Sequence, residues 1–524
     1  MTGRLVFLVV ALVAARPALA GAPAPQPPQP PPAEPVVPPP ATAPQGPDDD
    51  APEDLAAAAR GDPDTRLHED AEFGQLIQIE RIEITGNTAT QPELIERALP
   101  ISPGDVLHAS DRRLRDARFK VLALGFFRDV NLRIHKGSQR GQVVIEVNVI
   151  ERGTVVLNRL WFGTTDVSPW WFGADLGERN LLGLGIAVGG GFIYAGHGDL
   201  AEARDQYAGE LRAAMSSVGG TRWGASAAAT LVHGSEPFRT RKECDASAGD
   251  PPSPSPPPCA FSYRRLGARF GASYELSALT TLSLGLRLEA VDAALPAAPS
   301  RMLDDGSALA VDLHLDPDAS RVVTASLSFD RDTRPDPILP HAGARILASA
   351  ELGSALLGGS YDFATVFGSY EHYWPVHGDK HAIAIKLAGG IVVGDAPRFD
   401  RIHIADVDHM LTPRALGLVL STARPLGILA TAAGKPSYGD LGGSVTAEYV
   451  FQLFRGSGKQ RVYGGDVFFG AGLWGLAERN DLRVRDTGLL DALPIDVYLD
   501  AGLRIDTDIG VFELTIANAL GRLR

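Results

Sequence analysis

Long apolar runs, basic residues and cysteine are all scarce in this chain of 524 residues. After residue 20, no run approaches the roughly 18 apolar residues that a membrane-spanning helix needs. Lys and Arg number 49 against 63 Asp and Glu, which gives a net charge of −14 and argues against a nucleic-acid partner. A helical membrane protein and a nucleic-acid-binding protein are therefore both disfavoured.

The two cysteines, Cys244 and Cys259, lie in one Pro/Ser-rich segment, 234–261. If the protein is exported, the two thiols can oxidise, and we predict a disulfide that closes one surface loop. Metal binding by this pair is the weaker alternative, because no histidine lies near either cysteine.

The N-terminus has the pattern of an export signal. Arg4 precedes a short apolar core, and Ala18-Leu19-Ala20 has the small-x-small form of a cleavage site. We predict a signal peptide over 1–20, with an uncleaved anchor as the alternative. Residues 21–75 are rich in Pro and Ala and predict a disordered periplasmic tether.

Most of the remaining chain alternates between apolar and polar residues. Residues 281–290 place Leu282, Leu284, Leu286 and Leu288 on one side of a strand, with polar residues between them. The same pattern recurs in many segments, and the polar faces carry Gly, Ser, Arg and acidic residues. This pattern is typical of a transmembrane β-barrel, which turns its apolar face to lipid and its polar face to the lumen.

Residues 76–152 predict a separate soluble α+β domain. The expected order is a strand near 77–84, a helix that begins at Thr90 as N-cap, a helix over 111–124, and strands near 127–134 and 143–149. This β-α-α-β-β order resembles a POTRA domain. The residues that carry the resemblance are Gly86, Asn87, Gly104, Gly125, Phe127, Asp129 and Val130. A POTRA domain implies polypeptide binding in the periplasm by strand addition.

Residues 153–524 predict a barrel of fifteen recognisable antiparallel strands. The links between them alternate between short turns and long loops, which are 234–261, 292–318, 396–440 and 477–492. Short turns face the periplasm in such barrels. Because bacterial barrels normally have an even number of strands, we expect a sixteen-strand plan whose last strand is missing or atypical.

A POTRA domain directly before such a barrel resembles the BamA/TamA superfamily of outer-membrane assembly and translocation proteins, also called the bacterial surface antigen family. The barrel residues that match its motifs are Asp330, Arg331, Asp332, Gly442, Gly443 and Glu448. The resemblance implies that loop 396–440 folds into the lumen and carries an arginine motif, here Pro413, Arg414 and Gly417.

In the family that arginine meets an acidic residue on the lumen wall, where this chain has Gly470. Asp466 has the same facing parity and is the hypothetical partner of Arg414. A guanidinium in a lumen needs carboxylate or carbonyl acceptors. The alternative is an ordinary solvated loop arginine.

The resemblance implies a protein of the Gram-negative outer membrane that inserts β-barrels or translocates polypeptides. Expected partners are outer-membrane lipid, unfolded client polypeptides and periplasmic proteins, without nucleic acid. A passive channel, or a barrel that anchors a periplasmic partner, stays open as an alternative. We expect no enzyme, cofactor or metal site, because the twelve histidines are scattered and no catalytic set has supporting context.

Overall fold

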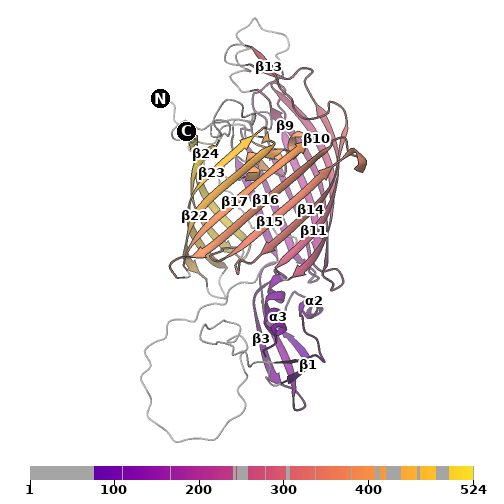
Figure 1. Ribbon diagram of the computed structural model, residues 1–524, viewed down its shortest axis with the longest axis vertical. Helices are drawn as coiled ribbons and strands as arrows, with labels where there is room; N and C mark the ends of the chain where they lie inside the picture. The colour runs from indigo at the N-terminus through magenta and orange to yellow at the C-terminus, as the bar shows by residue number, and fades with distance from the viewer. Residues whose placement is uncertain are drawn as a thin grey trace.

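The computed structural model describes residues 76–522, except 109, 166, 240–243, 245–257, 278, 303–306, 337, 379, 408–413, 421–437, 457–460 and 479–494. The predicted signal peptide and tether lie outside the described residues. A small α+β domain stands below one side of a large barrel (Figure 1).

The small domain has six elements, which are β1 (Leu76–Thr85), α2 (Pro92–Ala98), β2 (Val106–His108), α3 (Arg112–Ala123), β3 (Phe127–Lys136) and β4 (Gln142–Glu151). The sheet order is β2-β1-β4-β3, with β1 parallel to β4. Sequence reasoning missed the three-residue strand β2. None of the described helices is long and apolar enough to cross a membrane.

Three glycines of the predicted POTRA motif lie in turns of the small domain. Gly86 has φ +85°, and the carbonyl oxygen of Val149 occupies the space that a Cβ atom there would need. Gly125 ends α3 at φ +79° and donates to the Leu122 carbonyl. Gly104 also has a positive φ, and its amide donates to the Ile79 carbonyl. These three glycines therefore fix where β1 and α3 end and where the chain turns toward β2.

The other predicted positions of this domain belong to its core and its sheet. Phe127 and Val130 are 3 % and 0 % exposed and pack between the sheet and the helices. Asp129 accepts from the Arg118 guanidinium at 3.1 Å, and the Asn87 amide donates to the Thr90 carbonyl. Structural roles therefore account for all of these residues.

Fifteen antiparallel strands form the barrel in an unbroken order from β5 to β25. They are β5 (Val155–Gly163), β6 (Trp171–Leu181), β7 (Ile186–Ala195), β8 (Gln206–Met215), β9 (Trp223–Pro237), β10 (Ala260–Ser277), β11 (Thr280–Ala294), β14 (Ser320–Asp332), β15 (Gly343–Gly353), β16 (Phe363–Pro375), β17 (His381–Gly394), β22 (Leu441–Arg455), β23 (Val462–Ala477), β24 (Ile495–Thr507) and β25 (Gly510–Arg522). The fifteen strands predicted from alternation are confirmed, and the part of the chain that the structure describes contains no sixteenth.

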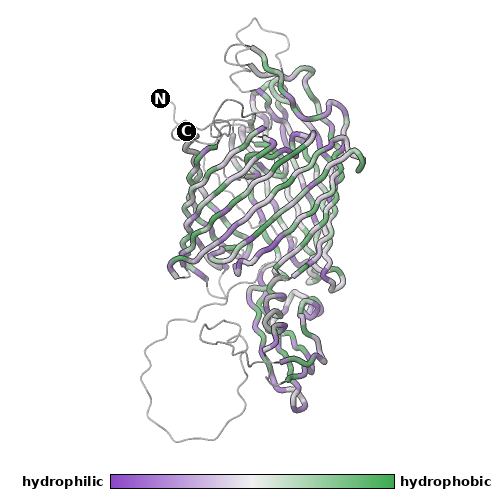
Figure 2. Tube along the Cα trace, in the orientation of Figure 1, coloured by the Kyte–Doolittle hydropathy of each residue, from purple (hydrophilic) through white to green (hydrophobic). Residues whose placement is uncertain are grey.

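Alternation along each strand separates the two faces of the barrel wall. Leu284, Leu286 and Leu288 of β11 are 57 %, 42 % and 42 % exposed on the outer face, whereas Arg287 and Glu289 are 9 % and 5 % exposed inside. Apolar and polar positions accordingly alternate along the tilted strands (Figure 2). The wall thus offers hydrocarbon to lipid and charge to the lumen.

The two end strands of the barrel sheet barely pair. Neighbouring strands elsewhere share long ladders, but β5 and β25 are not paired in the sheet order. Among the described residues their periplasmic ends meet through one backbone hydrogen bond, from the Leu157 amide to the Ile509 carbonyl at 2.8 Å. We call this boundary the seam. Because fifteen strands alternate in direction, β5 and β25 run the same way.

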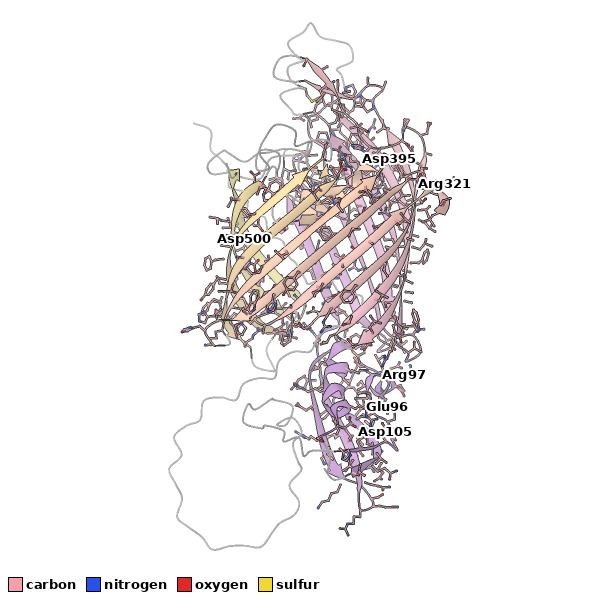
Figure 3. All side chains as sticks on the ribbon, viewed as in Figure 1. Glu96, Arg97, Asp105, Arg321, Asp395 and Asp500 are labelled. Carbon is pink, nitrogen blue, oxygen red and sulfur yellow. A yellow bond between two sulfur atoms is a disulfide. The ribbon has the colours of Figure 1, made fainter. Side chains whose placement is uncertain are left out.

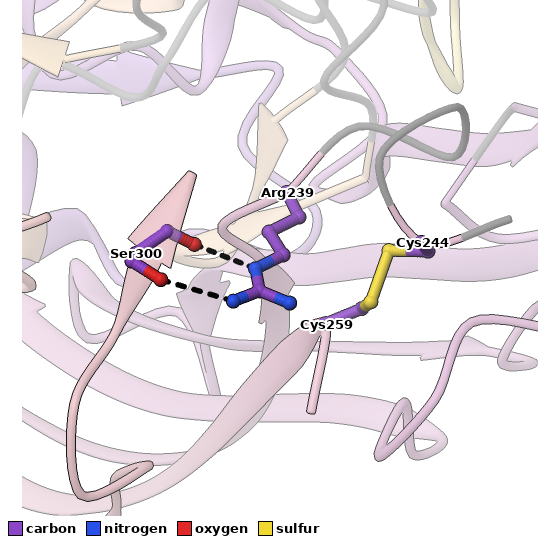
Figure 4. The surroundings of a disulfide bond; sticks show 4 residues. All are labelled: Arg239, Cys244, Cys259 and Ser300. Atoms are coloured by element: carbon purple, nitrogen blue, oxygen red, sulfur yellow. Dashed lines mark hydrogen bonds between the residues drawn. A yellow bond between two sulfur atoms is a disulfide. The ribbon is translucent and has the colours of Figure 1, made fainter. Parts of the chain in front are cut away.

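Long loops lie at the end of the barrel opposite the small domain. The predicted disulfide is confirmed, since Cys244 and Cys259 are joined in the link between β9 and β10 (Figure 4). Close by, the Arg239 guanidinium donates to the Ser300 carbonyl at 2.6 Å. Ser300 begins the outer hairpin of β12 (Ser300–Met302) and β13 (Ala308–Ala310), so two external links are tied together.

Glu151, at the end of β4, organises the contact between the small domain and the barrel. Its carboxylate accepts from the amides of Thr88, Ala89 and Thr90 at 2.7–2.9 Å. Burial alone would raise the pKa of Glu151, but these hydrogen bonds outweigh it and lower the pKa to about 2. Thr90 is therefore not the N-cap of α2 as predicted; Gln91 occupies that position.

The loop that Glu151 holds docks on the periplasmic turn between β6 and β7. Thr90 Oγ1 accepts from the Asn180 side chain at 2.9 Å, and the Gln91 amide donates to the Gly183 carbonyl at 3.1 Å. Arg97, near the end of α2, lies on the barrel side of the small domain (Figure 3). The small domain is thus held against the periplasmic rim of the barrel at the turn between β6 and β7.

Candidate functional site: the lumen and its inward loop

The described parts of loop 396–440 fold into the lumen, as the resemblance implied. The loop contains η4 (Arg398–Asp400), β18 (Ile402–His403), α5 (Ile404–Val407), β19 (Arg414–Ala415), β20 (Leu418–Val419) and β21 (Tyr438–Gly439). Phe399 is 5 % exposed, and the Arg265 guanidinium of the wall lies 3.7 Å from its ring centroid. Apolar loop residues therefore fill the upper lumen as a plug.

Two ion pairs attach the plug to the wall. Arg287 of β11 donates to both carboxylate oxygens of Asp400 at 2.8 and 2.5 Å. Arg398 of the loop donates to Glu236 of β9 at 2.8 Å. A bidentate pair fixes geometry as well as charge, so the plug has a defined seat.

Glu236 is the centre of the second attachment. Its carboxylate also accepts from the hydroxyls of Tyr263 and Tyr438 at 2.8 and 3.0 Å. The side chain of Glu236 is 2 % exposed, so three donors satisfy a buried carboxylate. Sequence reasoning missed Glu236, because its partners come from segments far apart in the chain.

Arg414 lies in this plug, but with another partner than predicted. Its guanidinium donates to Asp406 at 2.9 Å and to the Phe399 carbonyl at 3.2 Å. The residues after it form a tight hairpin in which Leu416 and Gly417 both have positive φ, +47° and +84°. Gly417 thus closes the turn that presents Arg414, while Pro413 lies outside the described residues.

The predicted pair of Arg414 and Asp466 does not form in the structure. Asp466 is 1 % exposed on the lumen side of β23 and lies 3.0 Å from Nε2 of His341 instead. The alternation along β23 shows that Asp466 faces the lumen. It does not show whether Asp466 lies at the height along the barrel axis that Arg414 of the loop reaches, and this is why the predicted pair was wrong. At Gly470, the position where the resemblance expects the acid, the Asp500 side chain from β24 occupies the space that a Cβ atom would need.

The motif near residue 330 supports the periplasmic turn between β14 and β15. Asp330 pairs with Arg345 at 2.7 Å, whereas Arg331 is exposed on the outer face. Asp332 accepts from Arg334 at 2.6 Å, and Arg334 also donates to Glu371 at 3.2 Å. Arg334 is the buried arginine of this turn, and the sequence analysis did not single it out. Its position between Asp332 and Asp336 in the sequence could have indicated an ion pair.

The second barrel motif contributes close backbone packing and a charge cluster. Gly442 and Gly443 of β22 lie against Gly389 and Gly390 of β17. Glu448 is 4 % exposed and accepts from Lys386 at 2.5 Å and from Arg504 at 3.4 Å. Glu448 thus links β22 to β17 through Lys386 and to β24 through Arg504 on the lumen side of the wall.

Below the plug, small side chains leave a cavity of about 550 Å³ in the lumen. Its wall is made mainly of Ala, Ser and Gly from β9 to β14, and Arg212, Arg269 and Glu351 also line it. Arg269 is exposed there. No group of three His, Cys, Asp or Glu residues suited to a metal ion occurs among the residues described. The site therefore consists of an upper lumen that the described loop residues occupy, above a cavity lined by small and charged side chains.

Family models match both units of the chain. The Omp85 superfamily domain matches residues 255–523, which is just over half of the sequence. The chain belongs to the Omp85 superfamily. The POTRA model, described as a surface antigen variable number repeat, matches residues 77–152, so the small domain is a POTRA domain. The Omp85 protein described here is a protein of the Gram-negative outer membrane with its POTRA domain in the periplasm.

Curated relatives and solved structures agree with this assignment. The chain is 22 % identical over 343 residues to the outer membrane protein assembly factor BamA of Nitratidesulfovibrio vulgaris, covering 64 % of this chain and 38 % of that protein. It is 36 % identical over 107 residues to BamA of Neorickettsia risticii, covering 20 % and 14 %. The chain thus spans well under half of these relatives. CdiB from Escherichia coli has the same fold, with a TM-score of 0.53, 13 % identity and coverage of 85 % of this chain and 73 % of that chain.

Proposed function

We propose that this Omp85 protein assembles polypeptides into the outer membrane, and that a client strand pairs at the seam between β5 and β25. The observation that carries the proposal is that β5 and β25 are not paired in the sheet: among the described residues, the one backbone hydrogen bond at this boundary joins the Leu157 amide to the carbonyl of Ile509, in the turn before β25. An open strand edge binds another strand through main-chain hydrogen bonds, without needing a particular sequence.

The plug supports a lateral route over a route through the pore. The Arg287–Asp400 and Arg398–Glu236 pairs hold loop residues across the upper lumen. A passive channel requires an open lumen, so the predicted channel alternative is the weaker one. Translocation through the lumen would require these two ion pairs to break first.

A covalent staple tests the proposal. Cysteines in place of Leu157 and Ile509 would lock the seam when oxidised. The matched control staples Phe172 to Tyr194, which are already register partners on β6 and β7. The protein is reconstituted in lipid vesicles. The probe is an eight-stranded outer-membrane barrel that has been unfolded in urea and is added to these vesicles. Insertion is measured by electrophoresis without heating, in which a folded barrel migrates differently from the unfolded chain.

We expect the oxidised seam staple to stop insertion of the probe, and reduction to restore it. The control staple should leave insertion unchanged in both states, although reduction also opens the Cys244–Cys259 bond. Full insertion with the seam locked would refute the proposed route.

A further inference from the structure

The turn between β15 and β16 presents two leucines to the outside of the barrel. It contains η3 (Ala355–Leu357), and Leu356 is 97 % exposed, more than any other large apolar side chain among the described residues. Leu357 beside it is 43 % exposed. We call residues 354–358 the outer turn. Because burial of apolar surface is favourable, these two adjacent leucines indicate a partner that the described part of the chain does not provide.

Hydrogen bonds give the outer turn a fixed shape. The Ser354 hydroxyl caps η3, since it accepts from the Leu356 amide at 3.2 Å. Asp362 accepts from the Ser354 hydroxyl at 3.0 Å and from the Ala355 amide at 2.9 Å. Gly358 then reverses the chain at φ +94°. The turn therefore holds both leucines away from the wall, whereas a flexible loop would let them fold back onto it.

The outer turn leans away from the lumen. After it, the Ser360 amide donates to the Arg321 carbonyl at 2.7 Å, and the Arg321 amide donates to the Ser360 hydroxyl at 3.0 Å. The next residue, Tyr361, is buried, and its hydroxyl shares a hydrogen bond with the Ser320 hydroxyl at 3.0 Å. The chain on both sides of the outer turn thus stays with the wall. The turn itself projects sideways from the barrel (Figure 1), and Figure 2 colours it as hydrophobic.

The outer turn lies where the apolar band of the wall gives way to charge. Arg321, which is exposed on the outer face, stands near the upper end of the wall (Figure 3). Its register partner on β11 is Ala290, which pairs with Leu266 of β10, and both are exposed outside. The next outward positions above them, Asp292 and Arg264, are charged. The leucines therefore stand at the border of the lipid-facing surface, where headgroups meet acyl chains.

The outer turn also lies opposite the seam. β14 is the eighth of the fifteen strands in the sheet order, so seven strands lie on each side of it. Gly359, directly after the outer turn, packs against β14, where a Cβ atom would lie 3.3 Å from the Val323 amide nitrogen. A partner of the outer turn would accordingly hold the part of the wall that is farthest from β5 and β25.

We propose that Leu356 and Leu357 insert between the lipids of the outer leaflet and anchor the wall opposite the seam. Lipid is the occupant that the position favours, because the outer turn continues a surface that already faces lipid and projects sideways from it. An apolar turn beside an arginine suits the headgroup boundary, since the arginine keeps its charge in water while the leucines are buried. The inference goes beyond the proposed function, because it holds equally for a barrel whose seam never opens.

Site-specific fluorescence in lipid vesicles tests the anchor. A cysteine replaces Leu356, and the polarity-sensitive dye NBD is attached to it without reductant, so that the Cys244–Cys259 bond stays closed. Leu352→Cys on the outer face of β15 is the control in lipid, and Leu309→Cys on the external strand β13 is the control in water. We expect blue-shifted emission at positions 356 and 352 only. We also expect loss of that emission when the lipids carry a spin label near the headgroup end of the acyl chain.

The outcomes separate lipid from the other possible occupants. Emission and quenching at position 356 that match position 309 would refute the anchor, whether or not the protein inserts client barrels. A blue shift at position 356 that the spin-labelled lipids do not quench would place the turn against protein and overturn the assignment to lipid. If that shift weakens when the protein is diluted in lipid, the occupant is a second copy of the chain. Electrophoresis without heating shows that each labelled barrel is folded, and all three leucines are exposed, so the substitutions leave the interior unchanged.

Discussion

Arg287 is the residue whose loss should loosen the plug most. Its guanidinium lies 2.5 Å from Asp400, 3.5 Å from Glu351 and 4.0 Å from Glu289. The side chains of Arg287 and Asp400 are 10 % and 11 % exposed. Arg287→Leu leaves Asp400 buried without its partner, so we expect the free energy of unfolding to fall by about 3 kcal/mol.

Loss of Asp400 should lower the free energy of unfolding by less than loss of Arg287, because Arg287 has two further carboxylates nearby. Asp400→Asn leaves Arg287 with Glu351 and Glu289, and we expect a loss of about 1 kcal/mol. Arg269→Leu is the control, since Arg269 is an exposed lumen arginine, and its loss should cost less than about 0.5 kcal/mol.

Urea unfolding in lipid vesicles, followed by tryptophan fluorescence, measures the three free energies. Ion conductance in planar bilayers measures release of the plug, and it should rise most for Arg287→Leu. Equal losses for Arg287→Leu and Asp400→Asn, or unchanged conductance in both, would refute the assignment of the plug's seat to this pair.

Three further predictions concern Arg414 and the POTRA contact. In double-mutant cycles Arg414→Ala should couple to Asp406→Ala by about 1 kcal/mol and should be additive with Asp466→Ala; coupling to Asp466 alone would restore the original pairing. Glu151→Gln should lower the melting temperature at pH 7. Since the pKa of Glu151 is lowered from 4.5 to about 2, its stabilisation is complete above about pH 4.5 and disappears as the pH falls to about 2; an effect that persists below pH 2 would contradict this. Gly183→Ala, at φ +75°, should displace the POTRA domain and speed proteolysis of the linker at 152–154; unchanged proteolysis would count against docking.

Strand positions could be predicted because alternation is a local signal. The alternation over 281–290 predicts a strand, and β11 spans Thr280–Ala294. The strand β2 escaped notice because three residues are too short to show a period.

Side-chain partners could not be predicted, because they depend on the path of a long loop. Asp466 has the right parity for a lumen residue, yet the turn after β14 reaches it first with His341. Likewise Glu236, Arg398 and Tyr438 meet only after loop 396–440 folds inward. The alternation of a strand determines which of its side chains face the lumen, but it does not determine which loop residues contact them.

The most direct test of seam pairing is site-specific photo-crosslinking in cells. The crosslinker replaces Leu160, an exposed residue of β5, or Leu284, an exposed residue of β11 on the opposite part of the wall. The account predicts that Leu160 captures outer-membrane polypeptides during their assembly and that Leu284 captures only lipid. Equal capture from both positions, or capture from neither, would contradict pairing of clients at the seam.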